Sequence, residues 1–558
     1  MPNAGVIAWA LSLYMWHGRR DPSRTPSPGE MWRPAPIELA AWCALAAILA
    51  LGLLSHTGAV ALGNDGCQYL SVADNIRQGN GIKTSILFFD AERSYGTIPA
   101  PMTTFPPVYS ILTAALATTG ISTATAAAGI SLVSFALTPL IFGLAVPAGI
   151  RPAGFRVAML LLVLNSSLLV MAGSIATEEL FMLVVVAAVL CFSRALVALG
   201  RRGLAWQACG WLLIGLSYWI RYAGLFLLAG ALAFFCLRAL LHWSRRTSLD
   251  LSTSVLALSA AGASMARNIA LSGSWKGSVA KRSSQLWPLT VRPSLEALYH
   301  VLLGEAKAGR GIAVACVFAG VAGLLLLGFR SWWLSRSRGA EFAPAYWMLW
   351  VLIGTYTAAM VYADTTMVVS VGSAYFTALL PLLLLLGVYS FSAMESASTG
   401  HALRLLCLAV VSIGYAAVHL GELWRYTPLV APDEVTKAWR GSGSASDLTS
   451  WAHTNLSPVE VITATNGQAT AYALGHPTLC VTDPPFTNVV WSRDRLFQEM
   501  ARFGSTYLIL YPGLRYESAP VQRTSPLIRG MIEGAIPDGL QVVARNASVI
   551  VLRRTPRQ

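Results

Sequence analysis

The sequence predicts an α-helical polytopic membrane protein, with about eleven transmembrane helices and a small C-terminal α/β extracytoplasmic domain. Of the 558 residues, 55% are hydrophobic and only 12% are charged, and a soluble protein would carry about twice that charged fraction. Uncharged apolar runs recur as far as residue 420. The last part of the chain contains no run long enough to span a bilayer.

About 20 apolar residues cross a bilayer as an α-helix, and eleven runs approach this length. They cover residues 37–62, 122–147, 156–173, 178–198, 206–220, 223–242, 251–270, 311–328, 346–363, 373–391 and 403–421. Residues 1–36 are predicted to form a cytoplasmic tail. Their apolar run, Val6–Trp16, is too short to span and is followed by no small-residue cleavage site. Between the fifth and sixth runs, Trp219-Ile220-Arg221-Tyr222 has to form a tight turn.

The distribution of lysine and arginine orients the spans. Arginines gather in alternate loops, which the positive-inside rule places in the cytoplasm. They are Arg19, Arg20, Arg24, Arg33, Arg151, Arg156, Arg201, Arg202, Arg245, Arg246, Arg330, Arg336, Arg338 and Arg404. The net charge of +14 therefore reflects membrane topology and does not indicate a nucleic-acid partner. The other loops and the C-terminal tail are predicted to lie on the periplasmic (extracytoplasmic) side of the inner (plasma) membrane.

The chain is predicted to divide into a transmembrane module, a linker and an extracytoplasmic domain. The module covers residues 37–421, the linker 422–444 and the domain 445–558, and the linker contains Ser442-Gly443-Ser444. Helical and strand-like segments alternate in the last part, which is typical of a small α/β domain. The predicted helices are 446–454, 468–474 and 493–503, and the predicted strands are 459–463, 479–481, 506–511, 540–543 and 548–552.

The first loop, residues 63–121, contains the most informative polar segment. Asp65 lies a few residues beyond the first span, and a polar hairpin follows it. A carboxylate near a membrane is costly and usually has a partner or a chemical role. Asp65 is placed to take a proton as a general base, or alternatively it caps a helix predicted over residues 66–78. The Pro106-Pro107 pair ends the hairpin and starts a short helix over 108–118.

Two acids follow on the same predicted side of the membrane. Glu178 and Glu179 open the fourth span after Thr177. Acids in the first turn favour the helix dipole, and threonine is a good helix cap, so a purely structural role is open. Because neighbouring helix positions point in different directions, one of the two acids can instead face the same cavity as Asp65.

Two arginines also fall on that side. Arg221 lies between two apolar runs and Arg267 closes the seventh span, where an unpaired cation is expensive. The guanidinium group is suited to phosphate oxygens, so the arginines are candidates for an anion pocket. The alternative is that they pair with lipid headgroups or with one of the two acids of the fourth span.

The loop after the seventh span is an exception to the charge rule. It is basic although it falls on the outer side, and an anionic ligand is the natural explanation. Its basic residues are Lys276, Lys281, Arg282, Arg292, Lys307 and Arg310. Lys276, Lys281 and Arg282 are expected to join the anion pocket.

The spacing of the cysteines and histidines does not indicate a metal site. The chain has no Cys-X-X-Cys motif or histidine cluster, so neither a metal nor another cofactor is expected. Of the eight cysteines, only Cys67 and Cys480 lie outside predicted spans. They could pair in an oxidising compartment, and the sequence leaves that pairing open.

Short segments between Asp65 and Pro381 resemble, in the same order, motifs of the GT-C superfamily of integral-membrane glycosyltransferases. This superfamily includes the protein O-mannosyltransferases and the bacterial lipid A aminoarabinose transferases. The matching segments are Asp65-Gly66-Cys67-Gln68-Tyr69-Leu70, Gly79-Asn80-Gly81, Phe105-Pro106-Pro107-Val108-Tyr109, Ala176-Thr177-Glu178-Glu179-Leu180-Phe181, Trp219-Ile220-Arg221-Tyr222-Ala223-Gly224, Arg267-Asn268 with Gly273, and Tyr375 through Pro381.

The resemblance implies inverting transfer of a sugar from a polyprenyl-phosphate donor to an acceptor, without a nucleotide or an obligatory metal. It implies that Asp65 is the catalytic base that activates the acceptor. Substrate contacts are expected from Tyr69, Tyr109, Glu178, Glu179, Arg221, Arg267, Lys276, Lys281, Arg282 and Tyr375. The expected partners are the lipid-linked sugar donor, a lipid, glycan or protein acceptor, and membrane lipids.

Two departures from the family pattern bear on the predicted site. Many relatives carry two adjacent acids in the first loop, whereas Asn64 and Gly66 flank Asp65 here, which favours metal-independent chemistry. Many also have an Arg-Tyr pair before the tenth span, but Ala374 precedes Tyr375. One phosphate or acceptor contact is therefore expected from another residue.

The sequence leaves two other classes of function open besides a transferase. A transporter or lipid flippase for a glycolipid or anionic substrate would place charges near the midplane and often shows internal repeats. Here the charges gather at one face and no repeat is evident, which favours the transferase. A non-catalytic assembly protein, whose outer domain binds a partner, is the third interpretation.

Overall fold

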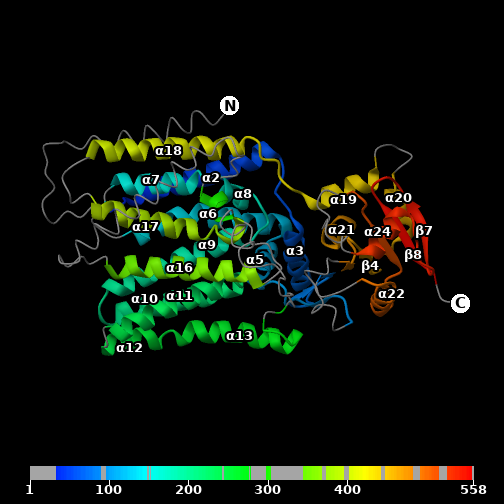
Figure 1. Cartoon of the computed structure of the whole chain (residues 1–558), viewed down its shortest axis with the longest axis horizontal. Helices are drawn as coiled ribbons and strands as arrows, with labels where there is room; N and C mark the ends of the chain where they lie inside the picture. Colours follow the sequence, from blue (N-terminus) through cyan, green and yellow to red (C-terminus); the bar gives the residue numbers. More distant parts are fainter. Residues whose placement is uncertain are drawn as a thin grey trace.

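Long helices fill one end of the molecule, and a mixed β-sheet with short helices fills the other (Figure 1). Helix α3 lies between the two parts (Figure 1). The computed structural model describes residues 33–88, 96–146, 150, 152–241, 244–275, 277, 297–302, 343–366, 373–394, 401–441, 447–481, 491–513 and 525–555.

The apolar runs of the sequence form helices, because a helix satisfies its backbone hydrogen bonds within the run. The first helices are α2 (Pro36–Thr57), α3 (Asn64–Arg77), α5 (Val108–Ala117), α6 (Thr123–Ala145), α7 (Pro152–Val163), α8 (Ser166–Ala172), α9 (Glu178–Val197) and α10 (Gly200–Ile220). Next come α11 (Gly224–Leu241), α12 (Arg245–Ser252), α13 (Val255–Ser272), α16 (Ala343–Thr366), the 3₁₀ turn η3 (Ser373–Tyr375), α17 (Leu379–Met394) and α18 (His401–Leu423).

By length and hydropathy, six of the described helices are able to cross a membrane, or seven if the bent pair α7–α8 counts as one span. The sequence predicted eleven spans, and that number stays a prediction. The apolar part of α17, Leu379–Ser390, is shorter than a spanning helix needs. The predicted span 311–328 lies outside the described residues.

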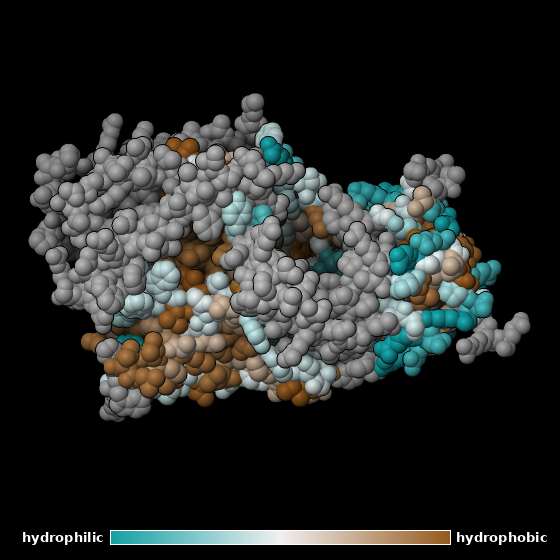
Figure 2. Space-filling view, in the orientation of Figure 1, coloured by the Kyte–Doolittle hydropathy of each residue, from teal (hydrophilic) through white to brown (hydrophobic). Residues whose placement is uncertain are grey.

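Helix α9 occupies the centre of the helical part. It packs against α6 and α10, while α11 packs on α16, α13 on α10 and α2 on α6. Phe192, Trp211 and Phe235 join α9, α10 and α11, with ring centroids 5.2–5.3 Å apart. Such close packing between apolar helices is what holds a bundle together in lipid. Brown, hydrophobic side chains cover the lower helices of this part in Figure 2.

The bent pair α7–α8 changes direction by 53° at Leu164 and Asn165. Asn165 caps α8 by accepting a hydrogen bond from the Leu168 amide at 3.0 Å. His419 of α18 accepts the Ser166 amide through Nδ1, also at 3.0 Å. Side chains thus satisfy the amides that the break frees, as a buried helix start requires.

Six strands form a mixed sheet in the order β2-β5-β4-β6-β8-β7, called the C-terminal sheet here. Its strands are β2 (Ile86–Leu87), β4 (Ile462–Ala464), β5 (Thr478–Cys480), β6 (Tyr507–Leu510), β7 (Leu540–Arg545) and β8 (Ile550–Arg554). The first four neighbours, β2 to β6, are parallel, and β8 is antiparallel to β6 and β7. The short helices around it are α19 (Ala431–Arg440), α20 (Thr449–Asn455), α21 (Gly467–Leu474), α22 (Arg493–Arg502) and α24 (Pro526–Glu533).

Strand β2 comes from the first loop and not from the C-terminal chain. Ile86 and Leu87 pair in parallel with Thr478 and Leu479, and the Thr478 amide donates to the Ser85 carbonyl at 2.9 Å. A separate two-stranded sheet in the first loop joins β1 (Lys83–Thr84) to β3 (Ala100–Pro101). The first loop and the last part of the chain therefore share one sheet.

Several predicted boundaries move. Helix α2 ends at Thr57, because Gly58 takes a left-handed conformation with φ +69°. Helix α3 begins at Asn64 and not at Gly66. The segment predicted as a linker contains the amphipathic helix α19, and α24 was not predicted. The domain limits and the side of the membrane stay predictions.

Candidate active site

Three extended segments meet beneath the candidate site. Ala61 and Leu62 lie in the middle, paired in parallel with Ser174 on one side and Val430 on the other. The Ala61 amide donates to the Gly173 carbonyl at 2.9 Å, and the Leu62 amide donates to the Leu429 carbonyl at 2.7 Å. The segment before Asp65 is thus held between the segment before α9 and the segment that enters α19.

Asp65 is the second residue of α3 and does not cap it. Gly63 is the N-cap residue, and no side chain donates or accepts a capping bond there. Among the described residues, none donates a hydrogen bond to the Asp65 carboxylate in this structure. The alternative interpretation of Asp65 as a helix cap is therefore wrong, and the carboxylate is left accessible to solvent.

Gly66 lets the start of α3 approach its neighbours. A Cβ at this position would lie 2.7 Å from Leu62 Cδ1 and 3.0 Å from the Ile175 carbonyl oxygen. Both distances are shorter than ordinary van der Waals contact. Glycine is therefore required for Asp65 to lie this close to the segment before α9.

Arg221 and Glu178 form a mostly buried ion pair beside Asp65. The Arg221 Nη1 lies 2.5 Å from Glu178 Oε1 and donates to Thr177 Oγ1 at 2.9 Å. Its guanidinium carbon lies 4.8 Å from the centre of the Tyr375 ring, a cation–π distance. The ion pair confirms the alternative in which Arg221 pairs with Glu178. The predicted tight turn is also confirmed, because α10 ends at Ile220 and α11 begins at Gly224.

Asp65 is electrostatically coupled to this ion pair. The pKa of Asp65 is raised from 3.8 to about 6, mainly by desolvation and to a smaller extent by the negative charge of Glu178, while the positive charge of Arg221 lowers it. By surface area the side chain is exposed, so the carboxylate is accessible to a ligand although protein groups surround it closely enough to shift its pKa. Such a shift is common at functional sites but is not restricted to them.

Tyr69 lies one turn further along α3, between Asp65 and a buried aromatic layer. Burial raises the pKa of Tyr69, and Asp65 raises it further, so the phenol stays protonated. Its ring packs edge-on against Phe105 and Tyr109, at 5.1 and 5.3 Å between centroids. A neutral hydroxyl therefore lies near the Asp65 carboxylate.

Tyr109 belongs to this layer and is fully buried. Its hydroxyl donates to the Ala127 carbonyl of α6 at 2.9 Å and lies 3.1 Å from Ser131 Oγ. The sequence predicted a substrate contact for Tyr109. In the structure it supports Tyr69 from beneath and has no surface to offer a ligand.

Glu179 points away from the Arg221 pair. It is fully buried in α9, and neither carboxylate oxygen has a hydrogen-bond partner among the residues described. Glu178 and Glu179 therefore have different environments, as the turn of a helix between neighbours requires. Of the two acids, Glu178 is the one that pairs with Arg221 and affects the pKa of Asp65.

Arg267 belongs to an adjacent network that anchors the first loop. Its Nη2 donates to the Met102 carbonyl at 2.9 Å. Tyr222 donates its hydroxyl to the Thr103 carbonyl at 2.7 Å and accepts from Asn268 Nδ2 at 2.9 Å. Because Tyr222 follows Arg221 in the chain, the loop network and the ion pair are mechanically connected.

No role was predicted from the sequence for three of these residues. Tyr356 of α16 is fully buried and donates its hydroxyl to the Tyr375 carbonyl at 2.6 Å. Tyr222 and Asn268 hold the first loop through hydrogen bonds. Each is adjacent in the chain to an arginine for which a phosphate contact was predicted. Tyr222 and Asn268 do belong to the motifs that contain Arg221 and Arg267, whereas Tyr356 lies in no motif.

The basic loop is not part of the described site. Lys276, Lys281 and Arg282 lie outside the described residues, so their role stays a prediction. The described ranges contain no group of three or more His, Cys, Asp or Glu side chains placed to hold a metal ion. Cys67 and Cys480 are both buried, and no disulfide joins them.

Comparisons with known proteins find structures of similar fold but no similar sequence. No family model matches the chain, and no curated protein sequence matches it. Crystal structures of ArnT from Cupriavidus metallidurans are similar; the one bound to undecaprenyl phosphate has a TM-score of 0.55 and 14% identity, over 94% of this chain and 100% of that chain.

A second group of similar structures comes from an archaeon. The oligosaccharyltransferase of Archaeoglobus fulgidus in its apo form has a TM-score of 0.52 and 13% identity, over 86% of this chain and 70% of that chain. The same enzyme with an inhibitory peptide and a dolichol-phosphate has a TM-score of 0.50 and 13% identity, over 85% and 69%. ArnT and this oligosaccharyltransferase are GT-C glycosyltransferases. At 13–14% identity these matches show the fold alone, and this chain has the fold of these two GT-C glycosyltransferases.

Proposed function

We propose that the protein is a membrane glycosyltransferase that moves a sugar from a polyprenyl-phosphate donor to an acceptor at the outer face of the inner membrane. The observation that carries the proposal is the exposed Asp65 carboxylate, which is electrostatically coupled to the Arg221–Glu178 pair. Structures of similar fold hold undecaprenyl phosphate or a dolichol-phosphate, which supports a lipid-phosphate donor.

Asp65 acts as the general base. An acceptor hydroxyl or amine attacks the anomeric carbon of the sugar while the Asp65 carboxylate takes its proton. The bond between the anomeric carbon and the phosphate oxygen breaks, and its electron pair leaves with the polyprenyl phosphate. Attack from the side opposite the leaving group inverts the configuration. With a pKa of about 6, Asp65 is mostly ionised at neutral pH and still basic enough to accept a proton.

Arg221 binds the donor phosphate. Its Nη1 serves Glu178 and Thr177, while its Nε and Nη2 make no hydrogen bond to another residue in the described ranges. A guanidinium group has five N–H donors in a fixed plane, so these remaining donors suit phosphate oxygens. Stacking on Tyr375 fixes the orientation of that plane. The leaving phosphate gains charge during transfer, and a positioned arginine stabilises it.

Substituting Asp65 tests this function. We expect Asp65→Asn to abolish sugar transfer while leaving expression and the melting temperature unchanged, because Asp65 makes no hydrogen bond to a described residue that the substitution would break. Asp74→Asn is the control on the same helix, because the Asp74 carboxylate contacts Arg77 at 3.9 Å and Thr123 and has no part in the proposed site. Full transfer activity in Asp65→Asn would exclude Asp65 as the base.

Lipid and glycan mass spectrometry of a deletion strain would identify the substrates. We expect one glycoconjugate to lose one sugar and the matching polyprenyl-phosphate sugar to accumulate. Reconstituted vesicles separate this function from transport. Translocation of a glycolipid without any new glycan product would replace the transferase by a transporter or flippase.

A further inference from the structure

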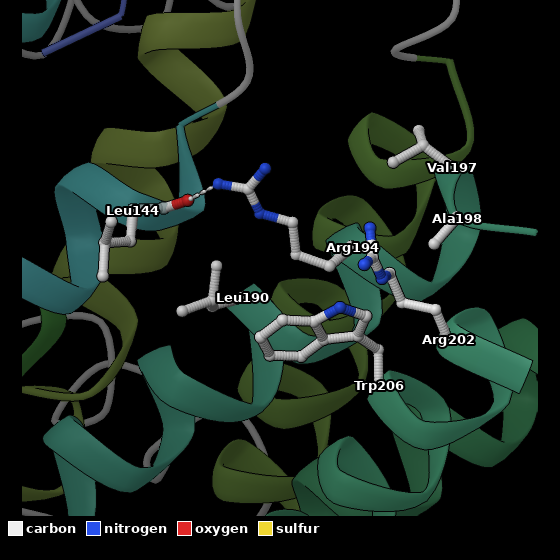
Figure 3. Close-up of a pocket in the computed structure, with 7 residues that line it drawn as sticks. All are labelled: Leu144, Leu190, Arg194, Val197, Ala198, Arg202 and Trp206. Atoms are coloured by element: carbon white, nitrogen blue, oxygen red, sulfur yellow. Dashed lines mark hydrogen bonds between the residues drawn. The ribbon is translucent and has the colours of Figure 1, made fainter.

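A pocket of about 540 Å³ lies at the end of the helical part opposite Asp65. It is lined by aliphatic side chains of α6 and α9, by Arg194 of α9, and by Arg202 and Trp206 of α10 (Figure 3). Arg194 follows Glu178 by 16 positions on one helix, which separates them by about 24 Å along its axis. The pocket is therefore separate from the candidate active site.

Two guanidinium groups give the pocket its charge. Arg194 reaches across it and donates to the Leu144 carbonyl at 2.9 Å, through Nη2. Arg202 is exposed and makes no hydrogen bond or ion pair with another described residue in this structure. In Figure 3 both guanidinium groups lie on the same side of the Trp206 indole ring. The residues that line the pocket include no acid, so its positive charge is not compensated there.

The rim of the pocket is apolar and open. Leu144 is 39% exposed, Val197 60% and the adjacent Leu199 81%. Exposed aliphatic side chains of this kind at the end of a membrane-spanning helix face lipid chains. Tryptophan is enriched at the level of the lipid headgroups, where its ring meets both environments.

We propose that this pocket binds the phosphate headgroup of an anionic membrane phospholipid. The two arginines match the phosphate oxygens in charge and geometry. The exposed aliphatic side chains beside them hold the first part of an acyl chain, which a free phosphate lacks. The lipid joins α6, α9 and α10 at the end of the bundle that the arginine distribution predicts to be cytoplasmic.

Native mass spectrometry of the full chain in detergent tests the proposal. Phosphatidylglycerol, phosphatidylcholine and inorganic phosphate are titrated separately, and thermal unfolding is followed in parallel. We expect phosphatidylglycerol to bind and to raise the melting temperature, whereas phosphatidylcholine and inorganic phosphate do neither. Arg202→Gln should weaken phosphatidylglycerol binding about tenfold, as expected for the loss of a charge-assisted contact.

Arg201→Gln is the matched control. Arg201 is exposed, like its neighbour Arg202, but does not line the pocket, so we expect binding to be unchanged. Arg202→Gln breaks no bond seen in the structure and should fold normally. Equal weakening by both variants would mean diffuse attraction to a basic surface and would overturn the proposal. Binding of inorganic phosphate alone, or equal binding of phosphatidylcholine, would also overturn it.

Discussion

Asp65 has neighbours of opposite charge, and their balance sets its protonation. Glu178 raises the pKa of Asp65 and Arg221 lowers it, in addition to the larger effect of desolvation. Since the proposed base acts only when it is ionised, transfer should depend on pH near this pKa.

We expect the rate of sugar transfer to fall as the pH is lowered through about 6, because protonated Asp65 cannot accept a proton. Glu178→Gln removes the negative charge that raises the pKa of Asp65, so the acidic limb should move to lower pH. Initial rates measured on both sides of pH 6 would show it. An acidic limb at the same pH in both proteins would contradict the coupling.

The ion pair of Arg221 and Glu178 allows a structural role to be separated from a binding role. Arg221→Gln alone leaves a mostly buried carboxylate unpaired, which typically costs about 3–5 kcal/mol of stability. The double variant Arg221→Gln with Glu178→Gln should recover most of that stability and still fail to transfer sugar. Thermal unfolding and transfer assays are compared. If the double variant transfers sugar at the normal rate, Arg221 has only a structural role.

Gly66 tests the close approach of α3 to the segment before α9. A Cβ here would lie 3.0 Å from the Ile175 carbonyl oxygen, so Gly66→Ala should lower stability by about 1–3 kcal/mol and reduce transfer. Gly63→Ala is the control, because a Cβ at Gly63 meets nothing within 4 Å. Equal stability of the two variants, measured by chemical denaturation, would argue against this packing.

At the scale of elements, α3 is attached to both parts of the molecule. It packs against α5 in the first loop and against α21 of the C-terminal part. Strand β2, which follows it, is the edge strand of the C-terminal sheet. The position of Asp65 therefore depends on contacts that begin almost 400 residues later in the chain.

Leu87 of β2 tests this attachment. It is fully buried with Ala100, Val461 and Leu479, so Leu87→Ala should cost about 2–5 kcal/mol. We expect faster amide hydrogen exchange in α3 and reduced transfer, because β2 no longer holds the first loop on the sheet. Val459→Ala, at a position 83% exposed in the same part, should change neither. Unchanged exchange in α3 for Leu87→Ala would show that β2 does not position this helix.

Sequence patterns predicted correctly those elements that neighbouring residues determine. The short helix after Pro106-Pro107 was predicted to within a residue, and the turn at Arg221 was predicted correctly. Strand β2 could not be predicted, because two residues carry no periodic pattern and their pairing partners are distant in sequence. Helix α19 was missed because the Ser442-Gly443-Ser444 stretch that follows it suggested a linker.

At the scale of the whole molecule, the C-terminal sheet is continuous with the first loop. Deleting the chain beyond Gly441 would remove β5, the strand that pairs with β2, and expose the face of α3 that packs on α21. We expect such a deletion to lose transfer and to make the first loop sensitive to protease, although the apolar helices still insert. Retained transfer would mean that the last part of the chain is dispensable for the site.

The sequence alone determined that the chain is a membrane protein built of apolar helices, and it pointed to Asp65, Glu178 and Arg221. These conclusions rest on hydropathy, on the cost of charge near lipid and on short ordered motifs, all of which are local. The tertiary structure alone decided that Asp65 does not cap α3, and that Glu178 and not Glu179 pairs with Arg221. It also placed Tyr109 beneath the site. These outcomes depend on which side chains meet across helices and on a strand shared between distant segments, and no local pattern encodes that geometry.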